Sequence, residues 1–432
     1  MNPRDRQILH LALPSIVSNI SVPLLGLVDV AIVGHMGDPA YIGAISVGSM
    51  IFNLMYWVFG FLRMGTSGMT SQQLGKRALV EVVNLLLRSV VVGLSIAAAI
   101  LLLKSPIKFL AFSIISPDRS VAAMAGSYFE ICVWGAPAVL ALYGLTGWYI
   151  GMQNTRFPMV ISILQNVVNI VASLTLVYGF GLKVEGVAFG TLIAHYTGAF
   201  LALSIWWRYY GKLRKYANWS DLFDSEKMLD FFRVNTDIFL RTVCLVAVNL
   251  FFISAGSRQG TMILAVNTLL VQLYILYSYF LDGFAFAGEA MSGKFYGARN
   301  DNAFHETVKR VFGWGAVVAI VFTLLYLIGG QWFLELLTDD AEVVEMAMSY
   351  FPWAVAVPLA GLAAFVWDGV FIGITATRGM LVSSVISTIC FFAIYLSLSH
   401  SMGNHALWMA FVIYLMVRGG VQTVIFVKCH KK

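Results

Sequence analysis

The chain has 432 residues, of which 59% are hydrophobic and 12% are charged, and its mean hydropathy is +0.81. Soluble domains carry about 25% charged residues, so this composition excludes a soluble enzyme or binding domain and indicates a protein of the lipid bilayer. The net charge of +6 is not gathered into a clustered basic face, so no nucleic-acid partner is expected.

Apolar runs long enough to cross a bilayer follow one another along the whole chain, since a crossing helix needs roughly 20 apolar residues. About twelve runs are predicted, at approximately 8–34, 41–70, 79–103, 121–151, 157–179, 184–207, 229–255, 262–291, 308–334, 343–374, 379–399 and 404–427. They are continuously apolar and do not alternate, which argues against barrel strands. The predicted fold is therefore an all-α integral membrane protein with about twelve transmembrane helices.

The first run contains one ionisable residue, Asp29, in the stretch "LVDVAIVGHMG". A carboxylate inside a bilayer is costly and faces a cavity or a polar partner. Because desolvation disfavours its charged form, we expect Asp29 to bind a proton. A structural hydrogen bond to a neighbouring helix is the alternative. Pro14 lies earlier in the same run and makes a bend there cheap.

The fifth run carries a polar stripe, in which Gln165, Asn166, Asn169 and Ser173 recur at helical spacing. Such a stripe either lines a binding site or forms ordinary hydrogen bonds between helices. Both readings stay open from the spacing alone.

Further ionisable residues lie in the second half of the chain. Asp282 and Glu289 are seven residues apart in the eighth run, and Asp368 lies in the tenth. Arg241, in the seventh run, is a candidate counter-ion for one of them. These groups either form neutral pairs that stabilise the fold or attract a cationic substrate with the help of aromatic residues such as Tyr274.

The chain repeats itself at a shift of 222 residues. "GWYIGMQNTR" at 147–156 matches "GVFIGITATR" at 369–378, and "SYF" occurs at 127–129 and again at 349–351. Six predicted helices separate the copies, so we expect two lobes of the same orientation. The predicted division is an N-lobe at 1–207, a cytoplasmic linker at 208–228 and a C-lobe at 229–432.

Lys and Arg concentrate in the loops on one side of the predicted helices. The positive-inside rule therefore predicts that both termini are cytoplasmic in a multi-pass protein of the cell (inner) membrane. The four cysteines have no CxxC spacing and predict neither a metal site nor a disulfide. ATP-binding, zinc-protease and serine-hydrolase motifs are absent, so no enzyme activity and no cofactor is expected.

Four stretches together resemble the multidrug and toxic compound extrusion (MATE) family, closest to its DinF-like branch. They are "LALPSIVSNISVPLLGLVDVAIVGHMG", "NVVNIVASLTLVYGFGLKVEGVAFGT", "FLDGFAFAGEAMSGKFYGARND" and "WDGVFIGITAT". The resemblance implies two pseudo-symmetric six-helix lobes in a V-shaped fold, and export of mostly cationic amphiphiles against an inward flow of protons or sodium. It also implies a monomer surrounded by lipid.

The resemblance also implies roles for particular residues. Asp29 falls on the family's first-helix carboxylate and Pro14 on its first-helix proline, while Asn169 and Thr191 fall on positions that line its N-lobe cation site. Ser173 departs from the pattern, since many relatives carry a second carboxylate there. A sodium ion prefers several charged or oxygen ligands, so the loss favours proton coupling, with sodium at the Asp29 site as the alternative.

The sequence therefore predicts a secondary active antiporter that exports organic cations by alternating access. A flippase for lipid-linked oligosaccharides or other lipids is one alternative, for which a more cationic cavity is expected. An intramembrane enzyme is another, for which no paired nucleophile and base is found.

Overall fold

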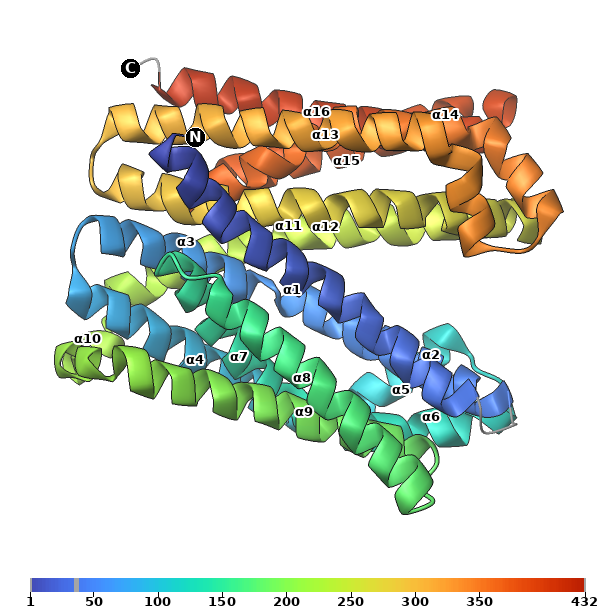
Figure 1. The fold of residues 1–432 in the computed structure, drawn as a ribbon, viewed down its shortest axis with the longest axis horizontal. Helices are drawn as coiled ribbons and strands as arrows, with labels where there is room; N and C mark the ends of the chain where they lie inside the picture. Colours follow the sequence, from blue (N-terminus) through green and yellow to red (C-terminus); the bar gives the residue numbers. More distant parts are fainter. Residues whose placement is uncertain (1, 35–38, 431–432) are drawn as a thin grey trace. The chain divides into compact units, whose positions relative to one another are not determined.

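The computed structural model describes residues 2–34 and 39–430, and within these residues the chain is helical with no strand (Figure 1). The helices are α1 (Pro3–Gly34), α2 (Pro39–Phe59), α3 (Phe61–Gly75), α4 (Leu79–Leu102), α5 (Lys104–Ile115), α6 (Arg119–Cys132), α7 (Ala136–Gly151), α8 (Arg156–Leu174), α9 (Val184–Ile205), α10 (Trp219–Leu222), α11 (Ser225–Arg258), α12 (Thr261–Gly297), α13 (Asp301–Leu337), α14 (Ala341–Gly373), α15 (Thr377–Met402) and α16 (Asn404–His430). Short 3-10 or π turns follow α6, α8 and α9.

Eleven helical segments of the described chain are long and apolar enough to cross a membrane. They match the second to the twelfth predicted runs, and the first run lies within α1, a helix of 32 residues. The prediction of an all-α integral membrane protein is confirmed.

Two predicted runs are each built from two helices. The run at 41–70 consists of α2 and α3, which meet at Gly60, and the run at 121–151 consists of α6 and α7, joined by the 3-10 turn Val133–Gly135. Pro137 lies in the first turn of α7, where its missing N–H is tolerated, whereas inside a continuous helix it would break the hydrogen-bond ladder. The chain therefore restarts its helix at that point.

A helix that the sequence analysis did not predict, α5, follows the third run. None of its residues is buried, and Phe109 and Ile114 are among its exposed apolar side chains. Lys104 and Lys108 both pair with Glu130 of α6, at 2.9 and 3.1 Å. Helix α5 thus has exposed apolar residues and lysines that pair with the neighbouring helix. This combination suits a helix at a membrane interface.

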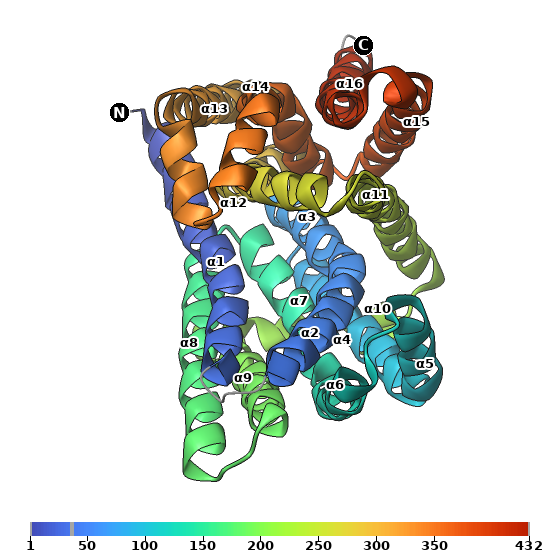
Figure 2. The same ribbon diagram turned by 90° about the vertical axis from the view of Figure 1, so that its right-hand side faces the viewer.

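Contacts divide the chain into two compact units of similar size, one of Val17–Phe232 and the other of Met1–Ile16 with Arg233–Lys432. We call them unit 2 and unit 1. Within unit 2, α8 and α9 lie side by side, and within unit 1 so do α15 and α16 (Figure 2). The first part of α1 groups with unit 1. The lobe and linker boundaries proposed from the sequence stay a prediction.

The 222-residue repeat recurs in the backbone geometry. Positive φ angles, which are uncommon for residues other than glycine, occur at Arg77 and Arg299 and again at Gln153 and Thr375. Each pair differs by 222 positions (77 + 222 = 299; 153 + 222 = 375). Equivalent turns in the two units therefore share the same unusual conformation.

The close packing of helices shows the same 222-residue shift. A Cβ atom on Gly147 would overlap the backbone of Arg63, and one on Gly369 would overlap the backbone of Ala285. The shift relates both members of these pairs (147 + 222 = 369; 63 + 222 = 285). The close crossing of α3 with α7 in unit 2 thus has its counterpart in α12 with α14 of unit 1, which identifies equivalent positions in the two units.

Candidate cation and substrate sites

Asp29 is buried in unit 2, with 4% of its surface exposed, although it lies on a helix whose neighbouring residues are apolar. Among the described residues its Oδ1 atom has no hydrogen-bond partner. The burial of a carboxylate without a basic partner costs free energy. Such a group is retained where its proton or a bound cation has a use.

Three hydrogen bonds align α1 with α8 and its continuation. Asn166 Nδ2 donates to the Ser21 carbonyl oxygen at 2.6 Å, and Tyr178 Oη donates to the Ile32 carbonyl oxygen at 3.1 Å. The hydroxyl groups of Ser21 and Ser162 are 2.7 Å apart. The three pairings are offset by 141 to 146 positions, so Asp29 lies at the level of positions 170 to 175, a stretch that contains Ser173.

Asn169, Ser173 and Thr191 meet between α8 and α9, and all three are buried. Asn169 Nδ2 donates to Thr191 Oγ1 at 3.0 Å. Within the described chain, Asn169 Oδ1 and Ser173 Oγ have no hydrogen-bond partner. Gly190 of α9 allows this contact, because a Cβ atom there would overlap Ser173 Oγ. The helices thus meet over an acceptor and a hydroxyl that are available to a ligand or to Asp29.

The repeat supports the same grouping independently. The positions equivalent to Asp29, Asn169 and Ser173 are Phe251, Phe391 and Tyr395 (29, 169 and 173, each + 222). In unit 1 the Phe251 ring lies 6.0 Å from the Phe391 ring and 5.2 Å from the Tyr395 ring, between centroids. These three positions therefore converge in unit 1, and the repeat predicts that the polar side chains at the equivalent positions of unit 2 converge as well.

The other two residues of the predicted stripe face different neighbours. Asn166 binds the α1 backbone, as described above. The Gln165 side chain lies against Gly198 of α9, where an added Cβ atom would approach the Gln165 amide carbon to 2.6 Å.

Two residues near Asp29 were not predicted as site residues. Tyr128 and Cys132, both buried in α6, interact electrostatically with the Asp29 carboxylate. The repeated "SYF" tripeptide contains Tyr128 and was a signal of its position, whereas the sequence treats Cys132 as a packing residue. Tyr128 Oη lies 3.5 Å from Ser49 Oγ.

The predicted residues of unit 1 separate into two groups. Arg241 and Asp368, both buried, form an ion pair between α11 and α14. Asp282 lies on α12 and interacts electrostatically with Tyr274, whose ring packs against Phe411 at 5.2 Å. Glu289 is buried on the same helix.

Two further residues from α16 complete the Asp368 cluster and were not predicted as site residues. Gln422 Nε2 donates to Asp368 Oδ1 at 2.7 Å, and Arg418 Nη2 lies 3.4 Å from Asp368 Oδ2. The charge of Arg418 inside an apolar run was the available signal. Its partner lies 50 positions earlier in the sequence (418 − 368 = 50), so no local pattern could indicate the contact.

A repeated bundle of membrane-crossing helices, with buried ionisable groups in both halves, defines the class of the protein as a polytopic membrane transporter. The MatE family model matches residues 14–175 and 238–396, so the chain belongs to the MatE family. It is a transporter and not an enzyme.

Individual relatives agree with this assignment. The chain is 36% identical to DNA damage-inducible protein F of Escherichia coli (strain K12), over 96% of this chain and 90% of that protein. It is 21% identical to the multidrug export protein MepA of Staphylococcus aureus (strain MSSA476), over 46% of this chain and 44% of the relative. A solved structure described as the outward-facing conformation of a multidrug resistance MATE family transporter has the same fold, with a TM-score of 0.88 at 19% identity, covering 100% and 97% of the two chains.

Proposed function

We propose that the protein is a secondary active antiporter of the cell membrane, which exports organic, mostly cationic amphiphilic compounds in exchange for protons by alternating access. The observation that carries this proposal is Asp29, a buried carboxylate that no basic residue of the described chain neutralises. A carboxylate in this state binds either a proton or an organic cation more readily than it stays ionised alone. Competition between the two is the basis of exchange.

Asn169 and Ser173 suit the two protonation states of Asp29. The Ser173 hydroxyl can donate a hydrogen bond to an ionised carboxylate, and Asn169 Oδ1 can accept one from the protonated form. Protonation thus changes which hydrogen bonds hold α1 against α8. An equilibrium between two shapes of α1 shifts only if the shapes differ in proton affinity, and this change of partners supplies such a difference. Proton entry then favours release of the substrate.

Proton coupling is favoured over sodium coupling by the ligands available. Asp29 contributes one formal charge, and the neighbouring Ser173, Asn169 and Thr191 contribute neutral oxygen atoms. A hard cation prefers several oxygen ligands and gains from additional carboxylates. A proton needs a single carboxylate, so sodium is the weaker candidate for the coupling ion.

The name of one relative supports the substrate class. Relatives include a multidrug export protein and the E. coli DNA damage-inducible protein F. We infer an inner-membrane protein with both termini in the cytoplasm, acting as a monomer among lipids, with Gln165, Asn166, Tyr274, Asp282 and Glu289 as further candidates for substrate contact.

Reconstitution in liposomes tests the proposal. A proton gradient and a sodium gradient are imposed separately, and efflux of a panel of organic cations and anions is followed. We expect the proton gradient to drive cation export, and Asp29→Asn to reduce coupled export by roughly tenfold or more, because the amide keeps the shape and loses the exchangeable proton.

Asp118→Asn is the matched control, since Asp118 is an exposed carboxylate of the same unit whose side chain makes no capping hydrogen bond. This variant is expected to transport at the wild-type rate. Wild-type proton-driven export by Asp29→Asn would remove Asp29 from the mechanism.

A further inference from the structure

The groups in direct contact at Asp368 in unit 1 carry two positive charges and one negative charge. Arg241 and Arg418, from α11 and α16, both lie against the same carboxylate oxygen, Asp368 Oδ2. Gln422 Nε2 donates a hydrogen bond to the other oxygen, Oδ1. Two guanidinium groups therefore share one carboxylate, and all four side chains are more than nine-tenths buried.

Two donors of the cluster have no partner among the protein groups that the structure describes. Arg241 Nε and Arg418 Nε are buried and have no hydrogen-bond partner among the described residues. Arg418 Nη1 donates to Tyr414 Oη at 3.3 Å. A guanidinium group carries five N–H donors in a planar fork that matches an oxyanion. A buried cation with unpaired donors is costly, and a second anion would remove this cost.

Aromatic rings border the same groups. The Arg418 guanidinium lies 5.6 Å from the Phe365 ring centre and 5.7 Å from the Tyr414 ring centre. Tyr274, which packs against Phe365 at 6.3 Å between centroids, interacts electrostatically with both arginines and with Asp282. Asp282 therefore borders the cluster, while Asp368 is the carboxylate that contacts the guanidinium groups. The surroundings suit an organic compound with one charged end.

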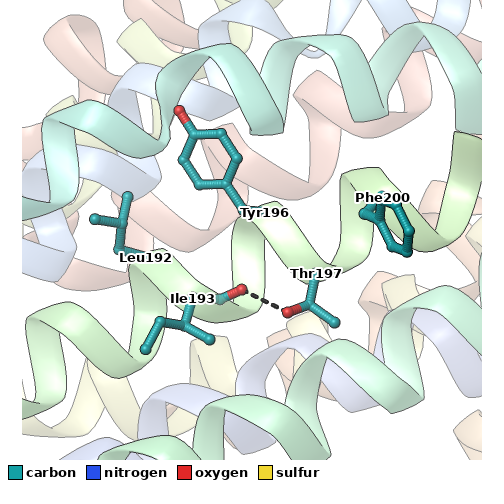
Figure 3. Close-up of a pocket in the computed structure, with 5 residues that line it drawn as sticks. All are labelled: Leu192, Ile193, Tyr196, Thr197 and Phe200. Atoms are coloured by element: carbon teal, nitrogen blue, oxygen red, sulfur yellow. Dashed lines mark hydrogen bonds between the residues drawn. The ribbon is translucent and has the colours of Figure 1, made fainter.

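The 222-residue repeat does not reproduce this cluster in unit 2. The positions of unit 2 equivalent to Asp368, Arg418 and Gln422 are Thr146, Tyr196 and Phe200 (368, 418 and 422, each − 222). Tyr196 and Phe200 line a pocket of about 450 Å³ on α9, together with Leu192, Ile193 and Thr197 (Figure 3). Tyr196 and Phe200 are 47% and 72% exposed, whereas Arg418 and Gln422 are buried, so the buried charges are a feature of unit 1 that the repeat does not carry into unit 2.

We propose that the Arg241, Arg418 and Gln422 cluster binds the oxyanion group, a carboxylate or a sulfonate, of an amphiphilic organic compound. The two guanidinium groups supply the charge and the donors, and Phe365, Tyr274 and Tyr414 contact the apolar part. The transporter accordingly recognises anionic or zwitterionic compounds through unit 1. This inference stands apart from the exchange at Asp29, because it concerns different residues in the other unit.

The test measures the binding of 2-naphthoate and of its neutral amide, 2-naphthamide, by calorimetry to the full-length protein in phosphatidylcholine nanodiscs, with empty nanodiscs subtracted. We expect the naphthoate to bind more tightly than the amide. Arg418→Gln is expected to weaken naphthoate binding roughly tenfold, since it removes one charge-assisted contact. Asp368→Asn is expected to tighten it, because the competing carboxylate is lost.

In a binding site the two variants have opposite effects on naphthoate binding. In a purely structural network either substitution would only weaken that binding. Arg258→Gln, an exposed arginine at the end of α11, is the control and leaves binding unchanged. If Arg418→Gln does not fold, Asp368→Asn still tests the proposal. We expect naphthoate to raise the thermal unfolding temperature of this variant.

Phosphatidylglycerol nanodiscs identify the source of the oxyanion. Weaker naphthoate binding there indicates that a lipid headgroup occupies the same cluster, and unchanged binding indicates a site for soluble amphiphiles. Equal binding of naphthoate and naphthamide, or unchanged naphthoate binding in Asp368→Asn, would overturn the proposal.

Discussion

At the scale of single residues, the two units use equivalent positions for different chemistry. Asp29, Asn169 and Ser173 make one polar group in unit 2, and their counterparts Phe251 and Phe391 belong to an aromatic cluster in unit 1. Aromatic rings stabilise a helix junction by packing, whereas a buried carboxylate destabilises it unless a ligand compensates. This difference supports the proposal that Asp29, Asn169 and Ser173 of unit 2 serve a ligand.

Gly190 decides how closely α8 and α9 approach at this group. In Gly190→Ala the new methyl group would overlap Ser173 Oγ and lie 2.8 Å from the Ser173 backbone nitrogen, so the helices must separate. We expect a loss of about 1–3 kcal/mol in the free energy of unfolding, as for other overpacked sites, measured by chemical denaturation in detergent.

Gly313→Ala is the control for this substitution, because nothing lies within 4 Å of an added Cβ atom there. It is expected to leave stability unchanged or to raise it by up to about 1 kcal/mol through helix propensity. Equal effects of the two substitutions would show that the α8–α9 contact at Gly190 is not close-packed.

Ser173 tests the choice of coupling ion. Ser173→Asp adds a second carboxylate near Asp29, which improves a site for a hard cation. We expect transport, or the thermal unfolding temperature, to become more dependent on sodium than in the wild type. Ser173→Ala serves as the control without added charge. An absence of sodium dependence in Ser173→Asp from zero to saturating sodium would show that this position does not select the ion.

At the scale of elements, the segment between the predicted lobes is held to α4. The predicted linker at 208–228 contains α10 and the first turn of α11. Arg88, 1% exposed, donates to the Leu222 and Asp221 carbonyl oxygens at 2.9 and 2.8 Å. Asn84 and Asn218 exchange two hydrogen bonds, of 3.1 and 3.2 Å. The last carbonyl groups of α10 thereby receive the donors that a helix end requires.

Arg88→Ala should release α10 from α4. The unpaired carbonyl oxygens are expected to cost about 1–3 kcal/mol locally, seen as faster amide hydrogen exchange in residues 216–224 and faster proteolysis there. Arg119→Ala, an exposed arginine of unit 2, is the comparison and leaves this segment protected. Unchanged exchange in Arg88→Ala would mean that other contacts hold the segment.

At the scale of the whole molecule, α1 belongs to both compact units. Its first 16 residues group with unit 1 and the remainder with unit 2. Arg4 pairs with Glu306 at 2.6 Å, and Asp5 pairs with Arg310 at 2.8 Å, which anchors the beginning of α1 to α13. Pro14 lies two positions before the boundary between the units. It cannot donate the hydrogen bond of a regular helix, so we expect α1 to bend more easily near this boundary.

Pro14→Ala should restore that hydrogen bond. We expect the free energy of unfolding to rise, by at most about 3 kcal/mol, and the transport turnover in liposomes to fall several-fold because α1 is stiffer. Pro3→Ala, at the first residue of the helix where proline is tolerated, is the control and changes neither quantity. A stabilised Pro14→Ala with unchanged turnover would show that bending at this residue is not part of transport.

The sequence by itself determined the membrane class, the helical runs, the 222-residue repeat and the choice of Asp29 as a candidate site residue. These follow from hydropathy, periodicity and an ionisable residue in an apolar run, all of which are local properties of the chain. Arg241 and Asp368 were identified as candidates in the same way.

Only the tertiary structure decided which of these groups meet. Arg418 and Gln422 join Asp368 because α14 and α16 pack together, and the fold of unit 2 brings Tyr128 of α6 within electrostatic range of Asp29. Helix α5 and the attachment of α10 to Arg88 also depend on contacts between segments that are distant in sequence. The sequence shows which residues are charged, but whether a charge is neutralised depends on the residues of other helices that lie beside it.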